Sequence, residues 1–336
     1  MSVNETDVPN NFSSDYHVKF SVMISFQIGS IFTSLIIFTS FALNRQVRID
    51  SRNHSLLLLL IISFLQVLTD LPMPIDFFRL NGIVQPATSA YCIWWIWYEF
   101  SLNKINITLM AWISVERHLL IFHSPFIQHM TAWKRRALHI GPLVVCVVWG
   151  PMFYLLTVII SPMCVNTRYF DQLLCGLPCY LSTNWGTFDL FVDVIAPIFI
   201  IFLSNLALFS RVIHQEKLMT GRVTQNSRSQ RKMASQLALI SILYLIVWLP
   251  VSIVQLGEIY ISRTFLSNYL NLFNFLLYFV PLLLPVIYLV STFQAIKQMK
   301  QRLFPQRNVA DVPPIIPRAR ANNLKQSAMI IANTGV

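Results

Sequence analysis

The run YCIWWIWYEFSLNKINITLMAWISVERHLLIF, residues 91–122, decides the fold of this chain. It is apolar and aromatic for most of its length, which predicts a helix buried in lipid or protein. At about 1.5 Å per residue, such a helix spans more than the roughly 30 Å of a bilayer core. Cys92 would then lie at one face of a membrane and Arg117 at the other. Between them the run carries polar side chains at mid-depth, namely Glu99, Asn103, Lys104 and Asn106.

Apolar stretches of comparable length recur along the 336-residue chain, which is 55% hydrophobic and only 12% charged. In a bilayer only helices and closed barrels satisfy their own backbone, and these stretches are too long and continuous for barrel strands. We therefore predict an all-α protein, a seven-transmembrane helix bundle. The expected spans are residues 20–43, 54–78, 91–122, 136–160, 187–214, 233–258 and 267–290. Pro72 and Pro74 should kink the outer end of the second span.

The seven spans imply four parts along the chain. Residues 1–19 would form an extracellular N-terminal tail, and residues 20–290 the seven-transmembrane domain. Residues 291–304 place Phe293, Ile296 and Leu303 on one stripe, which predicts a short amphipathic eighth helix on the inner leaflet. Residues 305–336 are rich in Pro, Asn and Arg and predict a disordered cytoplasmic tail.

The formal net charge of +11 is distributed unevenly. Most Lys and Arg residues fall in alternate loops and in the C-terminal tail, whereas the opposite loops hold only Lys19, Arg79, Arg168 and Arg263. This positive-inside pattern places the N-terminus outside the cell, in a multi-pass protein of the plasma membrane. It also argues against nucleic acid as a partner. The sequons at Asn4 and Asn11 then lie on the outer side, where glycosylation occurs.

Single residues that punctuate the spans form an ordered set. Cys92 and Arg117 stand 25 residues apart, and Arg117 lies within Glu116-Arg117-His118. The other members are Trp149, Pro197, Trp248-Leu249-Pro250, Pro285 with Tyr288, and Phe293. In order and in register across about residues 20–304, the set resembles the rhodopsin-like (class A) G-protein-coupled receptors, of which this chain would be a divergent member.

The resemblance implies a G-protein switch at the inner side of the bundle. Arg117 would pair with Glu116 in the inactive form, next to His118, and turn toward a G protein when the sixth span moves. The simpler alternative is an arginine that extends to the lipid headgroups. Trp248 with Pro250, and Pro285 with Tyr288, would be the ligand sensor and the hinges of the sixth and seventh spans; the alternative is two kinked, well-packed helices.

The resemblance also implies a disulfide from Cys92 to the outer loop. We predict Cys179 as its partner, which would leave Cys164 and Cys175 to close a small loop. Cys175 is a nearly equal choice, because connectivity among four cysteines cannot be deduced from sequence.

Several positions depart from the family's pattern. The internal sodium site of the family would involve Ser34, Ser63 and Leu284, none of which carries the carboxylate or amide that the family has there. We therefore expect no sodium site, no other metal and no cofactor. Gln230 and Asn205 replace residues that restrain or assist activation, so the inactive state should be less firmly locked.

Ionisable groups in the outer halves of the spans predict a ligand pocket, because charges at this depth are costly and usually functional or paired. Glu99 and Tyr278 match positions that amine-binding receptors of the family use. Lys104 offers the alternative of internal pairing with Glu99 or Asp193. The full set of expected ligand contacts is Glu99, Asn103, Asp189, Asp193, Ser252, Gln255 and Tyr278; Asp76 and Glu258 also lie at this depth.

The predicted function is a receptor that couples an extracellular peptide or cationic small molecule to a heterotrimeric G protein, with membrane lipid around it. The alternative is a polytopic transporter or channel, although neither internal repeats nor glycine-rich broken helices are visible. An enzyme is not expected: no metal-ligand spacing, nucleophile elbow or phosphate loop occurs, and the histidines are placed in loops or caps. Thr334, Gly335 and Val336 fit a C-terminal PDZ ligand.

Overall fold

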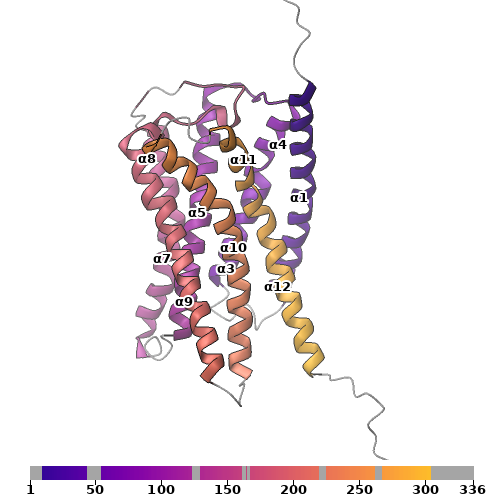
Figure 1. The fold of residues 1–336 in the computed structure, drawn as a ribbon, viewed down its shortest axis with the longest axis vertical. Coiled ribbons are helices and arrows are strands. Elements are labelled where there is room, and N and C mark those ends of the chain that lie inside the picture. The colour runs from indigo at the N-terminus through magenta and orange to yellow at the C-terminus, as the bar shows by residue number, and fades with distance from the viewer. Residues whose placement is uncertain are drawn as a thin grey trace, which may run out of the picture. The chain divides into compact units, whose positions relative to one another are not determined.

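The computed structural model describes residues 10–43, 54–122, 129–160, 164, 167–218, 225–261 and 267–303. Within these residues all regular structure is helical, which confirms the all-α prediction. The chain divides into two units, residues 1–292 and residues 293–336. Figure 1 shows the helices of the first unit running side by side in a bundle.

Seven helical segments correspond to the seven expected spans, and several consist of more than one element. The first is α1 (Asn10–Leu43), the third is α5 (Ser89–Phe122) and the sixth is α10 (Gln225–Tyr260). The second comprises α3 (His54–Leu65), η2 (Gln66–Asp70) and α4 (Pro72–Arg79); the fourth, α7 (Ala132–Tyr154) and η3 (Leu155–Ile160). The fifth comprises α8 (Asn184–Phe188), η6 (Asp189–Ile195) and α9 (Ala196–Leu218); the seventh, α11 (Ser267–Leu277) and α12 (Phe279–Leu303).

Six of these segments contain helices long and apolar enough to cross a membrane, but α5 is not among them. Its composition has a structural cause. α5 packs against α3, α7, α9 and α10, so it is the central helix and much of its surface faces protein. A helix in that position can carry Glu99, Lys104 and Asn106 without exposing them to hydrocarbon.

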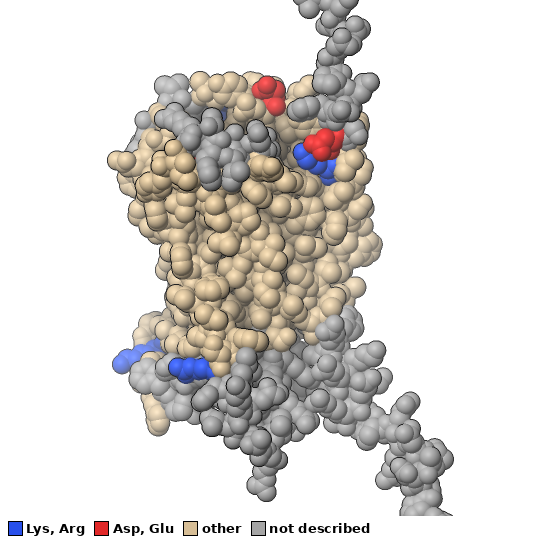
Figure 2. All heavy atoms as spheres, in the orientation of Figure 1, with Lys and Arg blue, Asp and Glu red and all other residues tan. Residues whose placement is uncertain are grey.

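The outward faces of the other helices are apolar. Phe32 on α1, Val145 on α7, Phe209 on α9 and Ile246 on α10 are each more than 60% exposed. On the face shown in Figure 2, the middle of the molecule is free of charged side chains, and the described Lys, Arg, Asp and Glu residues appear only toward its two ends. This is the surface that a multi-pass membrane protein needs, because lipid covers the middle band.

Three spans contain a π-helical turn in which the backbone widens to i→i+5 hydrogen bonding. Each turn ends two residues before a proline. A proline has no N–H to donate to the carbonyl of residue i−4, and its ring crowds that carbonyl oxygen. The pairs are Asp70 with Pro72, Ile160 with Pro162, and Ile195 with Pro197. The expected interruption of the second span near Pro72 is thereby confirmed.

The seventh span breaks at a different place from the expected hinge. Its helix is continuous through Pro285 and is interrupted at Tyr278, between α11 and α12. Pro281 explains this position, because a proline cannot bond the carbonyl four residues earlier, which here belongs to Leu277. α12 then continues to Leu303 as one helix. A separate amphipathic helix over residues 291–304 stays a prediction.

The predicted pairing of Cys92 with Cys179 is wrong. Cys92 bonds Cys175, and Cys164 bonds Cys179, which is the alternative that connectivity rules left open. Local backbone geometry explains the choice. Left-handed φ angles of 58° at Leu174 and 55° at Cys175 make a tight turn in η4 (Leu173–Cys175), and this turn buries Cys175 to 2% exposure. Cys179 begins the next short helix, η5 (Cys179–Ser182).

Candidate functional site

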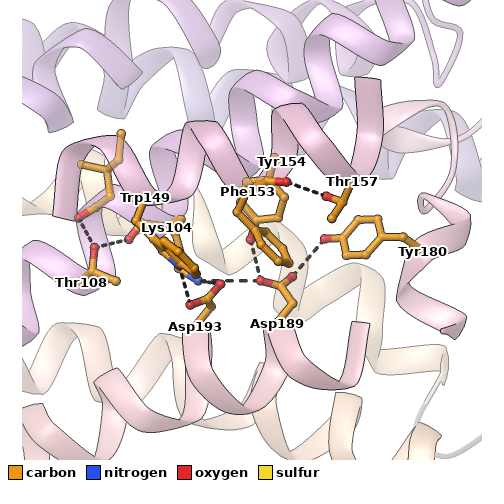
Figure 3. A network of polar contacts seen from close by, with 10 residues as sticks. Lys104, Thr108, Trp149, Phe153, Tyr154, Thr157, Tyr180, Asp189 and Asp193 are labelled. Carbon is orange, nitrogen blue, oxygen red and sulfur yellow. Dashed lines mark hydrogen bonds and ion pairs between the residues drawn. The ribbon is translucent and has the colours of Figure 1, made fainter. Parts of the chain in front are cut away.

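An ion cluster lies in the core between α5 and the fifth span (Figure 3). Lys104 forms an ion pair with Asp193, and its Nζ lies 3.8 Å from Asp189 Oδ1. Lys104, Asp189 and Asp193 are 3%, 6% and 2% exposed. The two aspartates lie four residues apart on η6 and therefore point to the same side. Lys104 thus takes the internal-pairing role, toward the aspartates and not toward Glu99.

Neutral side chains donate further hydrogen bonds to both aspartates. Trp149 Nε1 donates to Asp193 Oδ1 at 3.2 Å. Tyr154 donates its hydroxyl proton to Asp189 Oδ1 at 2.9 Å, and Tyr180 donates to Asp189 Oδ2 at 3.0 Å. Since Tyr180 belongs to η5, the cluster joins α5, α7, η6 and the disulfide-bonded outer loop. Buried charges are tolerated when they are paired and hydrogen-bonded in this way.

The aliphatic part of Lys104 reaches the cluster across Gly150 of α7. A Cβ atom at Gly150 would lie 2.8 Å from Lys104 Cγ and 3.1 Å from Lys104 Cβ. These are the first atoms of a side chain whose far end is held by two aspartates, so it has little freedom to move away. The glycine is therefore required by the close approach of the lysine stem.

We expect Gly150→Ala to lower the melting temperature of the purified protein by several degrees, because overpacking a filled core costs about 1–3 kcal/mol. The matched control is Gly141→Ala in the same helix. Nothing lies within 4 Å of a Cβ there, and alanine is the better helix former, so its melting temperature should equal or exceed that of wild type. Equal melting temperatures for the two variants would contradict the close-approach argument.

A second polar group surrounds Glu99, which is 5% exposed. Trp95 Nε1 donates to Glu99 Oε2 at 3.0 Å, and Tyr278 donates its hydroxyl proton to Glu99 Oε1 at 2.8 Å. Asp70, which is fully buried, is close enough to interact electrostatically with Glu99. The fold therefore brings Glu99 and Tyr278 together, as the sequence predicted, and adds a second carboxylate beside them.

A chain of amides continues from Asp70 toward the inner side. Gln66 Nε2 donates to Asn103 Oδ1 at 3.0 Å and lies 3.3 Å from Asp70 Oδ2. Asn106 Nδ2 donates to Gln66 Oε1 at 2.6 Å, and Ser63 Oγ donates to Asn106 Oδ1 at 3.2 Å. This chain uses the π-helical turn η2, which turns both Gln66 and Asp70 toward α5. The absence of a sodium site at Ser63 stays a prediction.

Ser252, Gln255 and the outer carboxylate Asp76 do not join either group. Ser252 is 4% exposed and donates to the carbonyl of Trp248 in its own helix at 2.8 Å. Gln255 is half-buried on α10. Asp76 forms an exposed ion pair with Arg79, three residues along α4. Asp189 and Asp193 belong to the Lys104 cluster.

At the inner end of α5, Glu116 is 6% and Arg117 3% exposed, and His118 is half-buried. Glu116 Oε1 bonds His139 Nδ1 on α7, a partner that the sequence did not suggest. The expectation that the histidines lie in loops or caps is wrong for His139, which lies inside the helix. Asn205 on α9 donates to Ser114 of α5 at 3.2 Å.

The other expected switch residues lie near the middle of α10 and in the first half of α12. Trp248 is 8% exposed and, with Pro250, lies within α10. Pro285 is inside α12, and Tyr288 packs against the core with its ring centroid 6.3 Å from that of Phe41. Gln230 lies in α10, but its side chain is outside the described part of the chain. Asn4 is also outside, and Asn11 lies in the first turn of α1.

Sequence reasoning missed Asp70, Gln66, His139, Tyr154 and Tyr180. Asp70 carried a usable signal, since it is an ionisable residue within a predicted span and two positions before Pro72. The tyrosines carried none, because a tyrosine hydroxyl in an apolar segment does not indicate which carboxylate it will meet.

The bundle, its charged core and its disulfide-bonded outer loop define a multi-pass helical membrane protein with seven helical spans. Residues 19–288 match the 7 transmembrane receptor (rhodopsin family), and the chain belongs to this family. It is therefore a signalling receptor of the G-protein-coupled type, and the predicted resemblance is confirmed. No curated protein matches the chain.

Proposed function

We propose that this receptor binds an extracellular peptide or small molecule through a positively charged group at Glu99, and activates a heterotrimeric G protein. One observation carries the ligand assignment. In the part of the chain that the structure describes, the hydrogen-bond partners of Glu99 are the neutral donors Trp95 and Tyr278, and Asp70 places a second carboxyl group nearby. A buried carboxylate without a cationic partner is costly, and a ligand cation would remove that cost.

Lys104 does not supply this cation, because it is engaged by Asp189 and Asp193. The two aspartates therefore support the shape of the pocket, while Glu99 and Tyr278 hold the ligand's charged group. Asn103, Ser252 and Gln255 lie on the neighbouring α5 and α10 and are proposed as further contacts. The transporter or channel alternative is set aside because the chain belongs to the receptor family.

The inner residues would carry the signal to the G protein. Arg117 is buried in this structure, so a partner protein reaches it only after the inner ends of the helices separate. Trp248 and Pro250 on α10, with Pro285 and Tyr288 on α12, would change conformation in that step. We also propose residence in the plasma membrane with an external N-terminus, glycosylation at Asn4 and Asn11, and a PDZ ligand at residues 334–336.

The proposed function is tested by nucleotide exchange on a panel of heterotrimeric G proteins in cell membranes. Amine- and guanidine-bearing peptides and small molecules are screened together with uncharged isosteres. We expect exchange with members of the cationic set, and loss of that exchange in Arg117→Ala at equal surface expression. Exchange driven by the uncharged isosteres alone would contradict the ligand class, and no exchange with any G protein would contradict the coupling.

A further inference from the structure

The inner end of α5 contacts α7 through His139, a residue that is not among the expected switch residues. Glu116 accepts a hydrogen bond at Oε1 from His139 Nδ1 of α7. Glu116 is buried at 6% exposure, and its Oε2 has no hydrogen-bond partner among the described residues. The hydrogen bond from His139 therefore connects this carboxylate directly to the neighbouring helix α7.

Three spans meet at this contact. His139 lies in α7, seven residues after the helix begins, and its side chain is 19% exposed. Its ring centroid lies 6.2 Å from that of His54, at the start of α3. Among the described residues, the titratable and charged groups on the elements packed around it are Glu116 and Arg117 of α5, His54 of α3, and the exposed Lys134, Arg135 and Arg136 in the first turns of α7.

The structure also indicates which conformation contains the contact. Arg117 follows Glu116 directly and is only 3% exposed, so no partner protein can touch its guanidinium in this form. The inner face is closed here, and contacts seen at this face belong to the closed form. A bond present in one of two forms shifts the equilibrium toward that form.

We propose that His139 is a positioning residue of the inner switch, which holds the Glu116 carboxylate against α7 and so favours the closed form when no ligand is bound. This inference rests on the proposed function, because it names how the same switch is restrained. Glu116, fixed by α7, keeps α5 in the position in which Arg117 is covered. Opening of the inner face then requires the Glu116–His139 bond to break.

The bonding atom allows a sharp test. His139→Phe keeps a ring beside His54 but removes the donor. His139→Asn places an amide nitrogen close to the position of Nδ1, whereas His139→Gln places it close to that of Nε2. We expect ligand-free nucleotide exchange, per receptor at the cell surface, to rise roughly three- to tenfold in the Phe and Gln variants and to return to the wild-type value in His139→Asn. A purely structural role would not distinguish Asn from Gln.

A second variant approaches the bond from the other side. Glu116→Gln replaces a charged acceptor with a neutral one, so ligand-free exchange should also rise. Because both changes remove the same bond, combining Glu116→Gln with His139→Phe should add little to either alone. The comparison of His139→Asn with His139→Gln decides the question if His139→Phe does not reach the surface. His129→Leu, at an exposed histidine ten residues earlier, is the control and should match wild type.

The outcomes separate this inference from the function on which it rests. If Arg117→Ala abolishes wild-type exchange while all His139 variants equal wild type, or if His139→Asn behaves like His139→Phe, the positioning role is wrong and the receptor function stands. If the effects of Glu116→Gln and His139→Phe simply add, the two residues act separately and the inference is also wrong. If no G protein responds to wild type, the proposed function fails and this inference fails with it.

Discussion

Lys104→Met should be among the most destabilising single substitutions in the core of this receptor. Methionine keeps the length and apolar stem of lysine but leaves Asp189 and Asp193 as two buried carboxylates without a cation. Breaking a buried ion pair from one side costs about 3–5 kcal/mol, because the remaining charge is not solvated. We expect the melting temperature of the purified receptor to fall by roughly 10 °C and surface expression to fall with it.

Two further variants make this prediction specific. Lys104→Met combined with Asp189→Asn and Asp193→Asn removes the whole set of charges and should recover most of the lost stability, since the three residues form one unit. Lys19→Met is the matched control. Lys19 pairs with Asp15 on α1, where the two side chains are 22% and 60% exposed, and its Nζ lies 5.8–6.0 Å from the ring centroids of Tyr16, Phe78 and Phe275, so its loss should cost far less than the loss of Lys104. Equal melting temperatures for Lys104→Met and Lys19→Met would show that the cluster is not needed for stability.

The second large effect is expected on ligand potency. Glu99→Gln keeps the shape of the side chain but removes the carboxylate: its single amide oxygen can still accept from Trp95, while its amide nitrogen can donate to the Tyr278 hydroxyl oxygen. Truncating one member of a buried charge pair typically costs 2–5 kcal/mol of binding, so the most potent cationic agonist from the screen should lose roughly 100-fold or more in potency. The measurement is the concentration dependence of nucleotide exchange.

The controls for Glu99→Gln use both the protein and the ligand. Asp76→Asn removes an outer carboxylate that is already paired with Arg79 at the surface, and it should leave potency within about threefold of wild type. Tyr278→Phe deletes one hydrogen bond to Glu99 but leaves the carboxylate in place, and it should have a smaller effect than Glu99→Gln. If an uncharged isostere of the agonist lost as much potency as the cation in Glu99→Gln, the charge-pairing argument would be refuted.

The spans could be predicted because a segment that crosses the hydrocarbon core must be apolar. The ends of the helices could not be predicted in this way. α1 begins at Asn10 and α10 at Gln225, ten and eight residues before the apolar stretches that predicted them. A helix continues beyond the membrane wherever its backbone bonds remain favourable, so the apolar length sets a minimum. α5 illustrates the opposite limit: its polar residues suit a central position that only the packing of its neighbours reveals.

The sequence predicted some of the residues of the candidate site, and it predicted their pairings less well. Glu99 and Tyr278 could be placed together by resemblance, and Lys104 was recognised as a possible counter-charge. Which carboxylates it neutralises depends on the direction in which η6 turns Asp189 and Asp193, and that direction is set by a widened turn before Pro197. The cysteine pairing and the His139 contact likewise depend on local backbone geometry that residue types do not encode.

The π-helical turns before Pro72, Pro162 and Pro197 change the phase of three spans. A π turn holds one residue more than an α turn, and one residue corresponds to about 100° around a helix axis. Helical-wheel arithmetic carried outward across these turns therefore assigns the wrong face, and a residue expected to point to lipid can point inward. The outer halves of these spans can thus present a different set of side chains at the end of the bundle that carries the disulfide-bonded loop, while the inner halves keep their orientation. Insertion or loss of a single residue at such a turn would therefore rotate the side chains on its outer side by about 100° and leave those on its inner side in place.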